Sequence, residues 1–369
     1  MKFSCLQENL NKGIQIVTRA IPTKSALPIL SNILISAEKN TLKLAATNME
    51  TTIITHIGAS IESEGSITVP AKIFKDFVSN LSPSTVNVQV TNDVIHVSSE
   101  KTKTKFNGTN AQDYPDLPEI DKEMNYLELD PKEFANAVSM VSFASGNDES
   151  RPMFTGVLIK NLKESILLAS SDGFRLSEKT LKTNNEYPEF TIVVPAKTLI
   201  EVAKIFSNSE EPLRLGVNEN ENQAVFYSES TFISTRILEG EFPEYKKIIP
   251  VDIVLSVDLP SVEFSEAVKL SNIFTSDNDS ALRIKFDPDG VIKIASVAAE
   301  TGEHESSVTG DVEGETLEIT FNPKYLLDYL NNVKTERIKF FAKTNTSPCL
   351  FKSDEHENFI HIIMPIMKA

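Results

Sequence analysis

The sequence predicts an α+β fold of three similar tandem domains, each with two helices packed on antiparallel sheets. The first observation is one short stretch that occurs three times: Val69-Pro70-Ala71-Lys72, Val194-Pro195-Ala196-Lys197 and Phe321-Asn322-Pro323-Lys324. The second is that each stretch opens a helical pattern with one apolar stripe and an acid four residues after the lysine. The copies lie about 125 residues apart, a spacing that suits tandem domains and is too long for a solenoid repeat.

The first domain is expected to contain two helices between short strands. A helix over residues 9–21 carries Leu10, Ile14 and Val17 on one stripe, and the first lysine helix continues to Leu81. The expected strands are residues 1–5, 29–35, 41–46, 51–57, 66–69, 86–90, 94–98 and 101–105.

The second and third domains are expected to repeat this order. Helices are predicted over residues 131–143 and 264–274, with Phe134 and Phe264 in register with Leu10. Further helices follow the second and third lysine stretches. The expected strands are residues 154–160, 166–170, 192–194, 213–217, 223–228, 231–238, 282–286, 291–296, 338–342, 350–352 and 359–364. Residues 171–176 are expected to form a turn that runs into a further strand.

Proline-containing stretches mark the domain boundaries. One runs from Asp113 to Pro118, and a matching one runs from Glu241 to Tyr245 before the second domain closes near Pro250. We therefore predict domains over residues 1–122, 123–252 and 253–369.

Composition limits the class of protein. The chain has 369 residues, 40% of them hydrophobic, and no apolar run approaches the ~18 residues that cross a bilayer. No secretory signal pattern is visible at the start, so a cytoplasmic location is predicted. Cys5 and Cys349 are expected to be free thiols in that compartment. The net charge of −16 argues against a protein that grips nucleic acid over its whole surface.

A search for catalytic chemistry finds little. The five histidines show no metal-ligand spacing, and no phosphate-cradling glycine loop occurs, so no metal or cofactor is predicted. One alternative is a hydrolase that uses paired carboxylates, given the many acids. The lack of tryptophan and of any aromatic-rich acidic cleft pattern counts against it. The other alternative is a scaffold of repeated domains that does not bind DNA.

Several motifs, in order along the whole chain, resemble the bacterial DNA polymerase III beta subunit family of sliding clamps. These motifs are Leu27-Pro28-Ile29-Leu30-Ser31-Asn32, Val69-Pro70-Ala71-Lys72, Ser171-Asp172-Gly173-Phe174-Arg175-Leu176, Gly240-Glu241-Phe242-Pro243-Glu244-Tyr245 and Met364-Pro365-Ile366. The resemblance implies a clamp fold, in which two three-domain crescents close head to tail into a dimeric ring around duplex DNA. It implies a non-catalytic processivity factor rather than an enzyme.

The resemblance also implies sites. A ring holds DNA by topology and needs only weak, sequence-independent phosphate contacts inside it. The residues placed near double-stranded DNA are Lys24, Lys72, Arg151 and Lys197. The family often has arginine at the position of Lys24, so a phosphate contact is kept there but a bidentate one is lost.

A second implied site is a groove that binds peptides of the clamp loader, the replicative polymerase and other clamp-binding proteins. Its implied residues are Phe154, Ser171, Gly173, Phe174, Arg175, Leu176, Pro243, Lys247, Ile248, Ile362, Met364, Pro365 and Ile366. Phe174 stands where the family often has histidine, and Lys247 where it often has arginine. An apolar tail with methionines makes an adaptable binding patch, although residues 362–364 could instead be a core strand.

A homodimer seam is predicted from charge. Lys101, Lys103 and Lys105 lie on one strand face at the end of the first domain, and Glu300, Glu303 and Glu305 form an acidic cluster in the third. Opposed head to tail, the two groups would pair and steer assembly. Ile273 and Phe274 are expected to supply apolar contact at the same seam.

Overall fold

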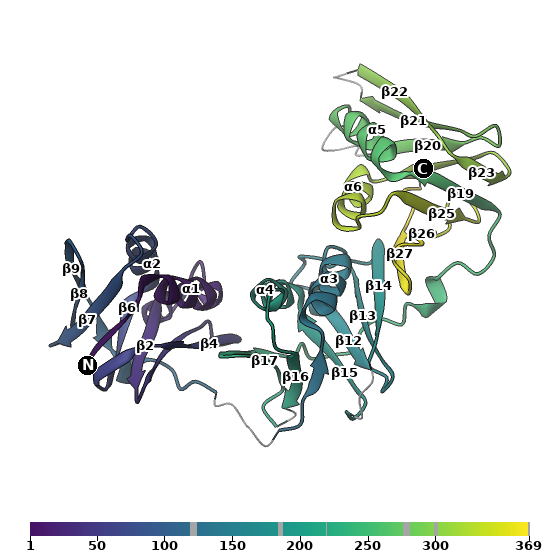
Figure 1. Ribbon diagram of the computed structural model, residues 1–369. Helices are drawn as coiled ribbons and strands as arrows, with labels where there is room; N and C mark the ends of the chain where they lie inside the picture. The colour runs from purple at the N-terminus through teal and green to yellow at the C-terminus, as the bar shows by residue number, and fades with distance from the viewer. Residues whose placement is uncertain (119–123, 184–186, 219, 276–280, 299–301, 368–369) are drawn as a thin grey trace. The chain divides into compact units, whose positions relative to one another are not determined.

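The computed structural model describes residues 1–118, 124–183, 187–218, 220–275, 281–298 and 302–367 (Figure 1). The chain forms two compact units, which are described separately. The first unit comprises Met1–Lys132 and Glu201–Ile237, and the second unit comprises Glu133–Ile200 and Leu238–Ala369.

The first unit has two sheets. One sheet has the strand order β5-β1-β7-β8-β9, and the other has the order β10-β6-β2-β3-β4-β18-β17-β16-β11. The strands are β1 (Lys2–Leu6), β2 (Asn32–Glu38), β3 (Thr41–Thr47), β4 (Thr51–Gly58), β5 (Ser60–Ser63), β6 (Gly65–Pro70), β7 (Thr85–Thr91), β8 (Val94–Ser99), β9 (Thr102–Asn107), β10 (Thr109–Asn110), β11 (Leu127–Leu129), β16 (Leu213–Asn218), β17 (Gln223–Ser228) and β18 (Thr231–Arg236).

The second unit also has two sheets. Their strand orders are β15-β12-β13-β14-β27-β26-β25-β19-β23 and β22-β21-β20-β24. The strands are β12 (Gly156–Asn161), β13 (Ser165–Ser171), β14 (Arg175–Lys182), β15 (Phe190–Pro195), β19 (Leu255–Pro260), β20 (Leu282–Phe286), β21 (Val291–Ala298), β22 (Gly302–Thr309), β23 (Asp311–Gly314), β24 (Leu317–Phe321), β25 (Arg337–Ala342), β26 (Cys349–Lys352) and β27 (Phe359–Ile363).

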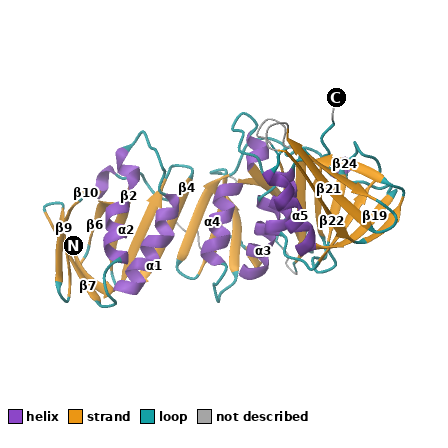
Figure 2. Cartoon of the chain, turned by 90° about the horizontal axis from the view of Figure 1, so that it is seen from above, coloured by secondary structure: helices purple, strands orange, loops and turns teal. Residues whose placement is uncertain are grey.

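Six α-helices are present in the described residues. They are α1 (Gln7–Val17), α2 (Ala71–Ser79), α3 (Pro131–Ser142), α4 (Ala196–Phe206), α5 (Ser261–Ile273) and α6 (Pro323–Asn332). In the first unit, α1 and α2 lie side by side over the strands, as Figure 2 shows. In the second unit, α5 and α6 pack on each other over a large aromatic and aliphatic core. One apolar stripe per helix accounts for this layering.

The sheets show that one module occurs three times. The run β4-β3-β2-β6 of the first unit has the same order as β14-β13-β12-β15 and β22-β21-β20-β24 of the second. The run β9-β8-β7-β1-β5 has counterparts in β18-β17-β16-β11 and β27-β26-β25-β19-β23. The predicted fold of three similar domains, each with two helices on antiparallel sheets, is confirmed.

Two strand pairs join consecutive modules (Figure 1). We call the antiparallel pair β4 and β18 the first junction, and the antiparallel pair β14 and β27 the second junction. Each junction merges two modules into one nine-stranded sheet. The central module is therefore divided between the two compact units. Its strand β18 is hydrogen-bonded to the first module, and its strand β14 is hydrogen-bonded to the third.

Several predicted boundaries were wrong. The first helix ends at Val17 and continues as a 3-10 turn to Ala20, and 3-10 helices occupy Pro28–Ser31 and Pro152–Thr155, where strands had been expected to begin. The prediction also missed the strands β5, β10, β11, β19, β22, β23 and β24. Much of β5, β22 and β23 is exposed, so these strands lack the apolar signal that periodicity detects.

Two further predictions concern thiols and membranes. Cys5 and Cys349 are free and buried, as expected. Among the described residues, none of the helices has the length and apolar character needed to span a bilayer.

Candidate functional site

One turn in the second unit is fixed by its own side chains. The Ser171 Oγ accepts a hydrogen bond from the Gly173 N–H at 3.0 Å and donates to the Arg175 carbonyl at 2.7 Å. The Asp172 Oδ1 accepts from the N–H groups of Phe174 and Arg175 at 2.9 and 3.0 Å. Gly173 has a φ of +94°, a left-handed conformation that glycine adopts without strain.

The same turn occurs in the first unit, at the equivalent end of β4. The Thr47 Oγ1 accepts from the Met49 N–H at 3.1 Å and donates to the Thr51 carbonyl at 3.2 Å. The Asn48 Oδ1 accepts from the N–H groups of Glu50 and Thr51 at 3.0 and 2.7 Å. Met49 has a φ of +75° where the other copy has glycine. The two junctions therefore carry one structural device with different side chains.

In the second unit, Arg175 ties the turn to helix α6. Its Nε donates to Asp172 Oδ2 at 3.0 Å, and its Nη1 donates to Asp328 Oδ2 at 2.6 Å. The guanidinium carbon lies 4.7 Å from the ring centre of Tyr325 and 5.9 Å from that of Phe143. Burial, with Asp172 nearby, raises the pKa of Tyr325. The Arg175 side chain is only 7% exposed, and a buried charge is costly unless it is paired. The two carboxylates provide this compensation.

An apolar cluster lies beside this turn. Its buried members are Leu158, Leu167, Ala169, Leu176, Val193, Tyr245, Leu350 and Ile362, and Met153, Leu238, Phe242, Ile249, Phe341 and Ile360 pack against it. Phe174 on the turn is 56% exposed, and Ile248 is 40% exposed. Exposed apolar side chains around a buried apolar cluster are typical of a protein-binding surface. We call the turn Ser171–Arg175, this cluster, the segment 243–248 and the tail 364–366 the partner surface.

The structure places all thirteen predicted partner-binding residues in the second unit. Gly173, Phe174, Pro243, Lys247 and Ile248 are exposed, Phe154, Met364 and Ile366 are half-buried, and Ser171, Arg175, Leu176, Ile362 and Pro365 are buried. The Met364 N–H donates to the Phe174 carbonyl at 2.8 Å, which joins the tail to the turn. Leu176 and Ile362 have 0% exposed surface, so they support the partner surface from beneath. The alternative that residues 362–364 form a core strand is therefore correct for Ile362, which is buried in β27.

The two junctions differ in the residue pair that directly follows the turn. Leu176 pairs with Ile362 across the second junction, whereas Thr52 pairs with Ser234 at the equivalent place in the first. The hydroxyls of Thr51 and Thr235 lie 3.1 Å apart there. The first junction has an apolar cluster of its own, which comprises Ala45, Ile54, Val225 and Phe232. The difference lies directly after the turn, where the second junction has an apolar pair and the first has a polar pair.

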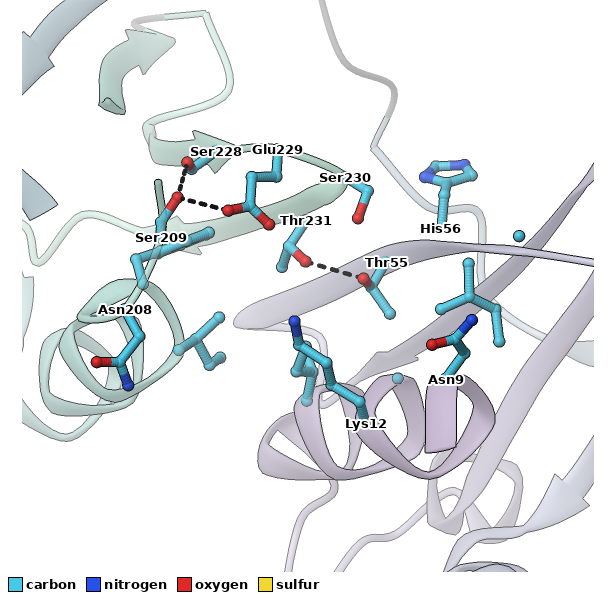
Figure 3. Close-up of a pocket in the computed structure, with 16 residues that line it drawn as sticks. Asn9, Lys12, Thr55, His56, Asn208, Ser209, Ser228, Glu229, Ser230 and Thr231 are labelled. Atoms are coloured by element: carbon cyan, nitrogen blue, oxygen red, sulfur yellow. Dashed lines mark hydrogen bonds between the residues drawn. The ribbon is translucent and has the colours of Figure 1, made fainter. Parts of the chain in front are cut away.

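The first junction borders a pocket of about 370 Å³ (Figure 3). Lys12 projects from α1 toward it, and Thr55 of β4 bonds to Thr231 of β18 at 2.8 Å. Ser209 lies beside Glu229 on the opposite wall, with a 3.1 Å hydrogen bond between them. The lining of this pocket is mixed, because the half-buried Ile16, Ile57 and Ile205 lie among these polar groups.

The repeated lysines lie on exposed helix faces. Lys72, Lys197 and Lys324 are all exposed near the start of α2, α4 and α6. Lys197 and Lys324 line one pocket of about 350 Å³ in the second unit, together with Asp328 and Arg175. Two of the three equivalent lysines therefore line the same pocket within this unit.

The other two predicted DNA-contacting residues lie on surface segments. Lys24 is exposed in the loop after α1. Arg151 is exposed, donates from Nε to Asp148 Oδ2 at 2.9 Å, and lies over the Phe154 ring at 5.0 Å. Hydrogen bonds from Ser150 and Arg151 lower the pKa of Asp148. Arg151 therefore already has an acidic neighbour that a phosphate would have to displace.

The predicted seam residues lie at two sheet edges. Lys103 and Lys105 are exposed on β9, the last strand of its sheet, and Glu303 is exposed on β22, also a terminal strand. Phe274 is half-buried and stacks on His304 with ring centres 5.3 Å apart. Glu300 lies outside the described residues. Ile273 on α5 is 69% exposed.

Sequence reasoning missed three residues of interest. Leu270 is 50% exposed on α5, and Ile73 is 59% exposed on α2. Asp328 is the acid four residues after Lys324, and the repeat gave no indication of its ion pair with Arg175. Aligning the first helix of each module would have revealed Leu270. With Leu10, Phe134 and Phe264 aligned, the position six residues later holds Ile16, Met140 and Leu270, which are all apolar. Among the described residues, no group of three His, Cys, Asp or Glu side chains could hold a metal ion.

Comparison with known proteins covers almost the whole chain. The N-terminal, central and C-terminal domain models of the DNA polymerase III beta subunit match residues 1–118, 128–244 and 246–367. The beta sliding clamp of Synechococcus elongatus is 28% identical over 374 residues, with 99% of each chain covered.

Solved structures agree with this assignment. The DNA polymerase sliding clamp of Bacillus subtilis is 26% identical with a TM-score of 0.94, and each chain is covered completely. The DNA polymerase III beta subunit of Thermotoga maritima is 26% identical with a TM-score of 0.93 and the same coverage. The chain therefore belongs to the bacterial DNA polymerase III beta subunit family, whose members are the beta sliding clamps.

Proposed function

We propose that two copies of this chain close head to tail into a ring around duplex DNA. The ring tethers the replicative polymerase and other clamp-binding proteins for processive synthesis. The family is non-catalytic, and no reaction is assigned to the chain. Because its template is the bacterial chromosome, we place the protein in the cytoplasm. The proposed domains are residues 1–122, 123–252 and 253–369.

The observation that carries this proposal is a pair of sheet edges, each ending in a strand that has a hydrogen-bonded neighbour on one side only. β4 pairs with β18 and β14 pairs with β27, so each module edge that meets another module is hydrogen-bonded. The remaining equivalents are β22 and β9, which are terminal strands of their sheets. Unpaired edge strands are templates for pairing with another chain. Joining β22 of one copy to β9 of the next forms a third type of junction, and a head-to-tail contact that closes makes a ring.

Exposed apolar residues support the same seam. Met140 of α3, which is 1% exposed, and the half-buried Phe143, which directly follows α3, pack into the core of the C-terminal module. Their equivalents on α5, Leu270 and Ile273, are 50% and 69% exposed. An apolar pair that is covered at one junction and open at its equivalent is expected to be covered by a second copy.

The register of the two filled junctions predicts the charge pairs. Thr55 lies opposite Thr231 at the first junction, and Lys179 lies opposite Phe359 at the second. The equivalent pair at the seam is Ser306 with Thr102 of the second copy, by the hairpin registers of β22 and β9. This register places Glu303 opposite Lys105 and Glu305 opposite Lys103 of the second copy. All four side chains are exposed on one sheet face.

Charge reversal tests this register. Changing Lys103 and Lys105 to Glu is expected to shift the protein toward monomers in analytical ultracentrifugation, because like charges then face each other across the seam. Adding Glu303→Lys and Glu305→Lys to the same chain is expected to restore the dimer. A reversed double variant that remains fully dimeric at nanomolar concentration would reject the register.

The DNA contacts are proposed for Lys24, Lys72, Arg151 and Lys197, and the equivalent Lys324 joins them. Exposed lysines on equivalent helix faces suit sequence-independent attraction to phosphates. The net charge of −16 discourages nucleic acid from binding elsewhere on the surface.

The partner surface is proposed to bind a short apolar peptide segment. The exposed Phe174 and Ile248 would contact the peptide directly, and the buried Leu176 and Ile362 would hold the surface in shape. Pro243, Lys247 and the tail residues Met364, Pro365 and Ile366 also belong to it. Phe154, Ser171, Gly173 and Arg175 complete the proposed set.

Retention on circular DNA tests the ring. Protein loaded by the clamp loader and ATP onto nicked circular duplex is expected to stay bound in high salt, because topology does not depend on phosphate contacts. Cutting the circle with a restriction enzyme should release it. Release from the intact circle by salt alone would show ordinary electrostatic binding and reject the ring.

A further inference from the structure

We propose that Asp328 is a positioning residue for partner binding and acts through Arg175. Asp328 belongs to the lysine helix α6 and does not form part of the partner surface. In this inference, which depends on the proposed partner surface, Asp328 fixes the direction of the Arg175 side chain. Arg175 in turn holds the Ser171–Arg175 turn in the shape that exposes Phe174.

The contacts of Arg175 favour a supporting role over direct peptide contact. Its side chain is 7% exposed and reaches Asp328 with a 2.6 Å hydrogen bond. Asp172 binds the same guanidinium but belongs to the turn itself, so it cannot fix the turn relative to the rest of the module. Asp328 is the acidic partner of Arg175 on a separate element, 153 residues further along the chain.

Comparison of the two junctions shows that the fold can form without this ion pair. The first junction has the same turn, but Thr51 stands in the place of Arg175. The acid equivalent to Asp328 is Glu201 on α4, and it pairs with Arg19, which follows α1 and is not part of the turn. The tie between the turn and the lysine helix thus occurs at the junction where an apolar pair, Leu176 and Ile362, directly follows the turn. The fold itself does not require such a tie, since the first junction forms without it.

The geometry also indicates what the tie controls. The Phe174 carbonyl accepts the Met364 N–H at 2.8 Å, so a shift of the turn also moves the tail. Both parts belong to the partner surface. Without Asp328, Arg175 keeps the Asp172 carboxylate as counter-ion, so the charge stays paired while its direction is no longer fixed. The expected consequence is a looser turn in a folded protein.

The test is the affinity of the full-length dimer for a labelled synthetic peptide that carries the clamp-binding segment of the same organism's replicative polymerase. By fluorescence anisotropy, Asp328→Ala is expected to weaken binding roughly tenfold, within the range of residues that act on a ligand without touching it. Asp328→Glu should restore most of the affinity. The matched control, Glu201→Ala, removes the equivalent acid at the first junction and should bind like wild type.

Hydrogen exchange distinguishes positioning from general destabilisation. Amides of residues 173–176 should exchange faster in Asp328→Ala, with unchanged exchange in β25 and β26. Asp328→Asn, which keeps an acceptor oxygen, provides a milder variant if the alanine variant unfolds. The inference is overturned if Asp328→Ala and Asp328→Asn bind the peptide like wild type, or if Glu201→Ala weakens binding equally. Failure of the wild type to bind the peptide would instead reject the partner surface, and this inference with it.

Discussion

Changing both Leu270 and Ile273 to Asp is expected to give a folded protein that is monomeric at micromolar concentration. These two side chains of α5 are equivalent to Met140 of α3 and to Phe143, which directly follows α3, and both pack against the C-terminal module. In the proposed ring each would be covered by a second copy, with the exposed Ile73 of α2 as an apolar neighbour there.

The size of the effect follows from burial. Each fully buried aliphatic side chain stabilises an interface by about 1.5–3 kcal/mol, and an unpaired carboxylate adds a further penalty. A ring contains two such seams. Together these terms correspond to an increase of at least a thousandfold in the dimer dissociation constant, at about 1.4 kcal/mol per factor of ten.

Sedimentation velocity across a dilution series measures this change. The matched control is Val262→Asp on the same helix, because Val262 is 66% exposed and its equivalents Glu8 and Lys132 are exposed charged residues. The control variant should remain dimeric. A double variant that sediments as a dimer like the control would show that this face of α5 lies outside the seam.

Sequence periodicity predicted the repeated module because helix burial repeats with it. The stripe positions Leu10, Phe134 and Phe264 are all core residues, at 0%, 0% and 3% exposure. The apolar strands were likewise found. β22, in contrast, was missed because its side chains are mostly exposed or half-exposed along Gly302–Thr309. Its burial does alternate, but two of the three less exposed positions are His304 and Ser306, so the apolar alternation that marks a strand in the sequence is absent.

The candidate site was predicted as a set of residues but not as a mechanism. The sequence indicated a turn at Ser171–Leu176, yet it could not indicate that Arg175 faces α6. That contact joins residues 153 positions apart, and no local pattern encodes it. Burial of Leu176 and Ile362 also depends on strand pairing across the second junction. Long-range register decides both features, and it is set by the assembled sheet rather than by neighbouring residues.

His361 is expected to make the second unit less stable in mild acid. It lies on β27 with 0% exposure, its ring stacks on Tyr329 at 5.1 Å, and its Nδ1 is 2.7 Å from the Ser177 Oγ. Burial, and to a lesser extent the charge of Arg175, lowers the pKa of His361 to about 3. The folded state therefore keeps the imidazole neutral over a range in which the unfolded chain binds a proton.

The direction of the effect follows from proton linkage. Because the unfolded chain binds the extra proton, stability falls as the pH drops below the unfolded pKa of about 6.5, and the loss continues toward pH 3. Well below pH 6.5 each pH unit costs about 1.36 kcal/mol, so the step from pH 7.5 to pH 4.5 costs about 2.7 kcal/mol from this one group. Carboxylates add their own acid dependence, so the contribution of His361 has to be isolated by substitution.

Urea unfolding of wild type and His361→Gln at pH 7.5, 6.0 and 4.5 isolates that contribution. Glutamine stays neutral at every pH and retains a group that can bond to Ser177. The variant is expected to be less stable than wild type at pH 7.5, because the stacking on Tyr329 is lost, yet to lose about 2.7 kcal/mol less than wild type on going to pH 4.5. His96→Gln, which changes a half-buried histidine of β8, serves as the control. An equal loss of stability in wild type and His361→Gln would mean that His361 takes up its proton without unfolding, and that the enclosure by Phe143, Tyr329 and Phe351 opens in acid.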